Sequence, residues 1–214
     1  AFGAVDDKTP NAYEESWDII DTDGTSATGS PTVINGGGGD GMFIYTSPSF
    51  SGATVTAAYQ NHGGAAAAES YTDFAIAFAP EGMEGLTLGA AISNNTIGAA
   101  NDADETTYYA TYAVGGFTLG MQASDRDETT TGSDQESIAY GVSYAVNDDF
   151  SVGYSYHELE TESTTDEDQE STGISASYTM GGMTLAGATN EVDNMEGTAT
   201  QDFEGYEFTL SFAF

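Results

Sequence analysis

Cysteine is absent from the 214-residue chain, and basic residues are almost absent, since Lys and Arg together number only 2. Without cysteine no disulfide framework can form, which is compatible with a protein of the cell envelope. Lys8 and Arg126 alone cannot build a basic patch, so nucleic acid is excluded as a partner. No run of about 18 apolar residues occurs, so we expect no transmembrane helix.

Acidic residues dominate the charge of the chain. Asp and Glu number 35, which gives a formal net charge of -33. A charge of this size is typical of intrinsically disordered chains. However, the sequence also holds 13 Tyr and 11 Phe, and these rings recur periodically along it. Periodic aromatic residues argue against disorder and favour a folded β structure.

The last nine residues show the clearest pattern in the sequence. Their large apolar side chains occupy every second position, namely Tyr206, Phe208, Leu210, Phe212 and Phe214. Strict alternation of this kind predicts a β-strand with one apolar face. In a soluble domain such a terminal strand would be an aggregation hazard. In a transmembrane β-barrel it is the expected lipid-facing side of a strand.

The same alternation continues through most of the chain and predicts eleven strands. We expect them at residues 42–47, 53–60, 71–79, 86–94, 106–114, 117–124, 137–146, 150–158, 172–180, 183–191 and 205–214. Short turns, such as Gly115-Gly116 and Gly181-Gly182, alternate with long polar loops that are mostly rich in Asp and Glu. The loops are expected at 61–70, 95–105, 125–136, 159–171 and 192–204. Short turns at one rim and long loops at the other predict an all-β, antiparallel transmembrane β-barrel.

Both ends of the chain resemble a known family. The C-terminal Phe214, preceded by alternating aromatic residues, resembles the terminal assembly signal of bacterial outer-membrane barrels. The irregular segment 1–41, followed by eleven strands, resembles the C-terminal part of a general diffusion porin of about sixteen strands. Residues 13–18 also resemble porins of the alphaproteobacterial type. The resemblance implies a fragment in which 1–41 folds into the lumen as a constriction loop and 42–214 forms barrel strands.

The resemblance also implies a function and a set of partners. We expect an outer-membrane porin that forms a homotrimer in the lipid bilayer, is inserted by the outer-membrane assembly machinery, and lets small hydrophilic solutes diffuse passively. Anionic groups beside a narrow aqueous path concentrate cations, so we also expect a cation preference. The pore-constriction residues are then Asp6, Asp7, Lys8, Glu14, Glu15, Asp18, Asp21 and Asp23. Arg126 is expected in an outer loop, away from the constriction.

Alternative functions follow from other residues. His157, predicted on the lumen side, leaves open an outer-membrane barrel enzyme, and the long loops leave open an adhesin. No G-x-S-x-G motif is present, so no catalytic residue is assigned. A soluble acidic β-protein stabilised by calcium is a further alternative. The acidic loops have the oxygen ligands that calcium prefers, but the run 21–24 lacks the spacing of an EF-hand. No other cofactor is expected.

Overall fold

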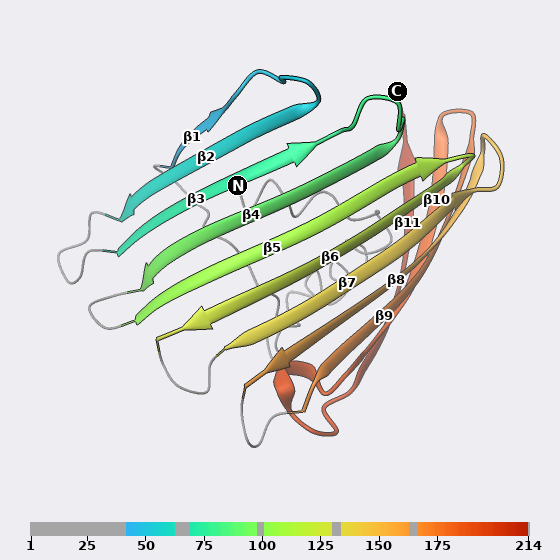
Figure 1. The fold of residues 1–214 in the computed structure, drawn as a ribbon. Helices are drawn as coiled ribbons and strands as arrows, with labels where there is room; N and C mark the ends of the chain where they lie inside the picture. The colour runs from blue at the N-terminus through green and yellow to red at the C-terminus, as the bar shows by residue number, and fades with distance from the viewer. Residues whose placement is uncertain (1–41, 63–68, 98–100, 130–133, 163–166, 214) are drawn as a thin grey trace.

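The computed structural model describes residues 42–62, 69–97, 101–129, 134–162 and 167–213, which form one antiparallel sheet of eleven strands. Strands that follow one another in the chain also lie side by side in the sheet, from β1 to β11. The sheet curves strongly, so that β8 to β11 turn away from the plane of the first strands (Figure 1). The predicted all-β, antiparallel arrangement of eleven strands is confirmed.

The bounds of the elements follow the alternating segments of the sequence. The strands are β1 Met42–Thr46, β2 Ala53–His62, β3 Glu69–Phe78, β4 Leu86–Ile97, β5 Asn101–Val114, β6 Phe117–Glu128, β7 Gln135–Ala145, β8 Phe150–Thr161, β9 Gln169–Met180, β10 Met183–Asp193 and β11 Phe203–Phe212. One short 3₁₀ turn, η1, spans Met195–Gly197.

Glycine makes the tightest hairpin possible. β5 and β6 are joined by Gly115 and Gly116 alone, whose φ angles are 57° and 88°. Two consecutive positive φ angles match the right-handed twist of the flanking strands, and glycine adopts them without a steric penalty. The short turn therefore fixes the register of this hairpin, in which Val114 faces Phe117.

The two faces of the sheet have opposite chemistry. One row that crosses the outward face runs from Leu88 through Ala110, Met121 and Tyr140 to Tyr156. Within this row the rings of Tyr140 and Tyr156 stack with centroids 4.9 Å apart. Large apolar side chains on this face are exposed, and Tyr206 reaches 78% exposure. An apolar face turned outward is the arrangement of a sheet that is surrounded by lipid.

The inward face of the sheet is polar and mostly buried. Thr107 on β5 and Ser124 on β6 face each other there, and their hydroxyl oxygens lie 2.8 Å apart in a hydrogen bond. Ser155 on β8 is fully buried on the same face. Aromatic side chains are also accommodated, since the ring of Tyr109 packs over the backbone of Gly89, where a Cβ atom would lie 2.0 Å from the ring. The described inner wall is therefore predominantly polar.

Several strands extend further toward the long-loop rim than the sequence predicted. β5 begins at Asn101 rather than at 106, and β6 continues to Glu128 rather than ending at 124. The predicted loop boundaries were wrong because acidic residues occur on both faces there and hide the alternation of polarity, while the strand pairing itself continues. A crossing of the hydrocarbon core needs about 9–11 residues, so the 14 residues of β5 exceed it.

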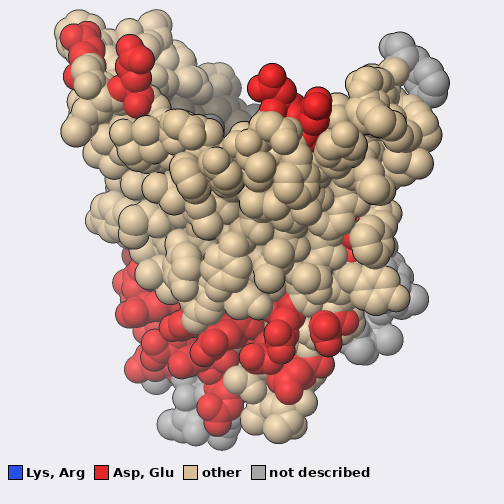
Figure 2. All heavy atoms as spheres, turned by 90° about the vertical axis from the view of Figure 1, so that its right-hand side faces the viewer, with Lys and Arg blue, Asp and Glu red and all other residues tan. Residues whose placement is uncertain are grey.

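The acidic ends of these strands form a belt on the outward face, beyond the apolar band. Figure 2 shows it as a broad red zone near one rim, with an almost uncharged zone beside it. We call this surface the outer acidic belt; its carboxylates belong to Asp102, Asp104, Asp125, Asp127, Glu136, Glu158, Glu160, Glu170, Glu191, Asp193 and Glu204. Many of them lie directly opposite one another, as Glu136 does with both Asp125 and Glu160. Like charges in opposed positions destabilise a sheet.

Asp125→Asn should therefore raise the thermal unfolding temperature in detergent. The substitution removes the repulsion with Glu136, and we expect a gain of at most about 1 kcal/mol that shrinks as salt is added. Glu84→Gln, in the short turn between β3 and β4, changes the net charge equally without relieving an opposed pair. Equal stabilisation by the two variants would show that total charge, not strand register, is responsible.

Candidate functional site on the inner wall

A cluster of charged side chains lies on the inward face of β5 and β6. Arg126 on β6 is directly opposite Glu105 on β5, and Glu128 follows two residues later on the same face of β6. Because successive side chains of a strand point to opposite faces, Asp125 and Asp127 face outward while Arg126 and Glu128 face inward. The pleat of the strand alone separates these neighbouring charges.

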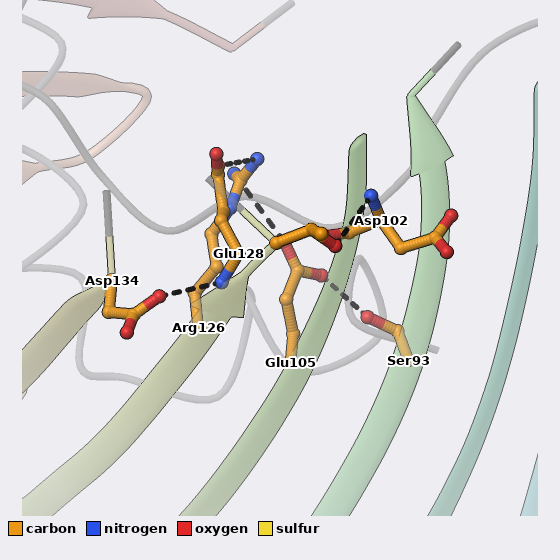
Figure 3. Close-up of polar contacts among 7 residues, drawn as sticks. Ser93, Asp102, Glu105, Arg126, Glu128 and Asp134 are labelled. Carbon is orange, nitrogen blue, oxygen red and sulfur yellow. Dashed lines mark hydrogen bonds and ion pairs between the residues drawn. The ribbon is translucent and has the colours of Figure 1, made fainter. Parts of the chain in front are cut away.

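Both terminal nitrogens of Arg126 contact carboxylates (Figure 3). Nη2 lies 2.7 Å from Oε1 of Glu128, and Nη1 lies 3.6 Å from Oε1 of Glu105. The other carboxylate oxygen of Glu105 accepts a hydrogen bond of 2.5 Å from the hydroxyl of Ser93 on β4. The backbone N–H of Glu128 donates to Oδ1 of Asp134 at 2.7 Å. The cluster therefore connects β4, β5 and β6 to the start of β7.

The two glutamates that contact Arg126 differ in burial. The side chain of Glu105 is 0% exposed, whereas that of Glu128 is 20% exposed and that of Arg126 is 18% exposed. A buried carboxylate is tolerated when a counter-charge and hydrogen bonds compensate it. Arg126 and Ser93 provide this compensation for Glu105, while Glu128 keeps contact with solvent. Two carboxylates and one guanidinium leave the cluster one net negative charge.

Carboxylates also outnumber bases elsewhere on this wall. Asp73 on β3 and Glu207 on β11 face inward together with Glu105 and Glu128. Arg126 is the single Lys or Arg side chain on the inner wall within the part of the chain that the structure describes. The described wall is thus negative, and its one permanent positive charge is already paired.

The sequence placed Arg126 in an outer loop, and this prediction was wrong. The run of acids around Arg126 had suggested a loop from 125 to 136, but β6 continues as a strand to Glu128. The alternation of Gln122, Ser124 and Arg126 on one face was the signal that could have shown it. The proposed constriction residues Asp6, Asp7, Lys8, Glu14, Glu15, Asp18, Asp21 and Asp23 lie outside the described residues, as does the whole segment 1–41.

The terminal strand has the geometry that its pattern predicted. Tyr206, Phe208, Leu210 and Phe212 are all exposed on the outward face of β11, and Phe214 lies outside the described residues. β11 pairs with β10 along its whole length, and within the described sheet it forms one edge. Its role as an assembly signal remains a prediction.

His157 lies on the inner wall, as predicted, and it is buried there with Ala139 and Ser171 as its cross-strand neighbours. Among the residues that the structure describes, no group of three or more His, Asp and Glu side chains is arranged to hold a metal ion. Calcium binding by the long loops remains a prediction. In the same described ranges, no helix is long and apolar enough to cross a membrane.

Arg126→Met should destabilise the protein by about 3–5 kcal/mol, because it leaves Glu105 buried without a counter-charge. Urea unfolding in detergent measures the loss. Arg126→Met combined with Glu105→Gln removes the uncompensated charge but keeps an acceptor for Ser93, so it should restore much of the stability. If the double variant is no more stable than Arg126→Met, the buried charge is not the cause.

Comparison with solved structures shows the same fold in outer-membrane proteins. The "Anion-selective porin from Comamonas acidovorans" aligns with a TM-score of 0.71 at 16% identity, over 81% of this chain and 59% of that chain. OmpT, an outer membrane protein of Vibrio cholerae folded in vitro, aligns with a TM-score of 0.60 at 14% identity, over 80% of this chain and 63% of that one. The chain therefore spans less than two thirds of the length of these proteins. No curated protein sequence matches it.

The sequence of the chain matches a protein family. The model described as Gram-negative porin matches residues 1–194, which is most of the chain. The match agrees with the features described above: one antiparallel sheet, an apolar outward face and a polar inward wall. The chain belongs to the family of Gram-negative porins and is a protein of the bacterial outer membrane.

Proposed function

We propose that the protein forms a water-filled channel through which small hydrophilic solutes and ions diffuse passively, with a preference for cations. Membership of the porin family supports the channel. The polar inner wall supports a hydrated lumen, since Ser, Thr and charged side chains line it. The channel performs no covalent chemistry, so the proposal assigns no catalytic residue.

The pairing of Arg126 is the observation that carries the cation preference. An arginine on a pore wall attracts anions when its guanidinium is free, but here both terminal nitrogens already face carboxylates. The partly exposed carboxylate of Glu128 is then the charge that a passing ion meets. The Comamonas porin is described as anion-selective, but at 16% identity its likeness shows the fold alone.

One charge on the pore wall changes the energy of a passing ion by an amount that Coulomb's law gives. A unit charge about 4 Å from an ion in bulk water changes the energy of that ion by about 1 kcal/mol. This energy corresponds to about a fivefold change in the local ion concentration, and salt reduces it with a screening length of about 10 Å at 0.1 M. Selectivity set by wall carboxylates should therefore be strongest at low ionic strength.

The reversal potential under a salt gradient tests the proposal on single channels in planar bilayers. The wild-type protein should show a cation preference. Glu128→Gln should lower the cation-to-anion permeability ratio by up to about fivefold, since it leaves Arg126 with the buried Glu105 alone.

Asp127→Asn is a matched control for Glu128→Gln. It changes the net charge equally at the adjacent residue, but its side chain belongs to the outer acidic belt and faces away from the lumen. We expect little change in the permeability ratio. An anion preference in the wild-type protein, or equal shifts in the two variants, would contradict the proposal.

We propose that the channel works as a homotrimer and that the outer-membrane assembly machinery recognises β11. The exposed apolar row of β11 supports the second statement, because it presents Tyr206 through Phe212 along one sheet edge.

Leu210→Asn should lower the amount of folded protein in the outer membrane several-fold more than Leu119→Asn does. Both leucines lie on the outward apolar face with similar exposure, 52% and 44%, but Leu119 belongs to β6 in the middle of the sheet. Semi-native electrophoresis of membrane fractions measures the folded amount. Equal losses would mean that the row of β11 only faces lipid and carries no assembly signal.

A further inference from the structure

The outward face of β9, β10 and β11 is hollowed into an apolar groove of about 450 Å³. Its floor is formed by Ala176 on β9 and Gly187 on β10, which are directly opposite each other in the sheet. Ile174, Leu185 and Phe208 are among the side chains that surround this floor. The groove exists because two small residues lie in a row of large ones.

Glycine at position 187 also shapes one wall of the groove. Phe208 on β11 faces Gly187, and a Cβ atom added there would lie 3.0 Å from two carbons of the Phe208 ring. The ring therefore leans over the glycine backbone. Phe208, on the edge strand β11, is 76% exposed and lines one side of the groove.

The groove lies on the lipid-facing side of the sheet, and one end of it lies near the short turns. It is continuous with the apolar outward face, and no acidic or basic residue lines it. One end reaches Phe150 and Tyr178, which lie close to the short turns. In outer-membrane barrels the short turns are periplasmic, so this end opens at the periplasmic leaflet, which is made of phospholipids.

Carboxylates stand beside this end of the groove. Asp148 and Asp149 are exposed in the turn that precedes Phe150. The backbone N–H of Thr179 donates a hydrogen bond of 2.7 Å to the carbonyl oxygen of Asp149, which fixes the turn against β9 next to Tyr178. Negative charges at this rim favour a headgroup with an ammonium over one that is purely anionic.

We propose that this groove binds one acyl chain of a zwitterionic phospholipid, of the phosphatidylethanolamine class, with its ammonium headgroup beside Asp148 and Asp149. The groove spans three strands, which are spaced about 4.8 Å apart, so its width suits a hydrocarbon chain. A protein partner of ordinary size would cover about 800 Å² of one surface, which is far broader than the groove. The site is separate from the lumen and from ion selectivity.

Photolabelling with a lipid probe tests the site. The protein, purified from outer membranes in its native oligomeric state, is placed in nanodiscs that contain phosphatidylethanolamine with a diazirine in the middle of one acyl chain. Peptides from 174–189 and 206–208 should carry several-fold more label than the outward face of β4 to β6. Ala176→Trp fills the floor and should lower that label by about fivefold.

Two controls keep the experiment decisive. Ala110→Trp adds the same bulk to the outward face of β5, outside the groove, and should leave the groove label unchanged. Channel conductance in planar bilayers verifies that both variants fold, and Ala176→Leu replaces Ala176→Trp if the larger residue prevents folding. The wild-type labelling map needs no variant at all.

The headgroup is tested separately. A phosphatidylglycerol probe with the same diazirine should label the groove several-fold less, and Asp148→Asn with Asp149→Asn should remove the difference. Equal labelling by the two lipids would overturn the headgroup assignment. Even labelling around the whole barrel would show ordinary annular lipid and overturn the site. A groove that is labelled only after the oligomer is dissociated would show that a second copy of the chain fills it.

Discussion

Hydrocarbon offers no hydrogen-bond partner to a peptide group, and this constraint organises the whole chain. Every strand from β2 to β10 is paired on both sides, so its backbone groups are satisfied within the sheet. Pairing in turn imposes the two-residue pleat, because side chains of a strand must alternate between the faces. The apolar outward face and the polar inward wall both follow from this single pattern.

The pleat also separates charges that the sequence places side by side. Asp125 and Asp127 belong to the outer acidic belt, while Arg126 and Glu128 between and after them form the inner-wall cluster. One β-strand thus contributes to two surfaces with different surroundings. The inner cluster is compensated by an ion pair and by Ser93, whereas the belt consists of carboxylates without opposite charges beside them on its face.

The alternation of side chains was enough to predict the strands, their order and the direction of each face. The prediction was correct for Phe74, Ile76 and Phe78 because these large apolar side chains alternate with alanine. It failed between 101 and 105 and after 124, where acids on both faces hide the alternation. The pairing of Arg126 with Glu105 was missed because both residues had been assigned to loops, although the two-residue turn at Gly115 and Gly116 sets the register that places them opposite each other.

The turn at Gly115 and Gly116 has a consequence for how such a protein can change over evolutionary time. Deleting a single residue from β6 between the turn and Arg126 would move every following side chain of this strand to the opposite face of the sheet. A deletion close to the turn would bring Leu119 and Met121 to the aqueous lumen and would turn Arg126 toward the outward face. Length variation in this family is therefore expected to accumulate beyond the ends of the strands, or in steps of two residues within them.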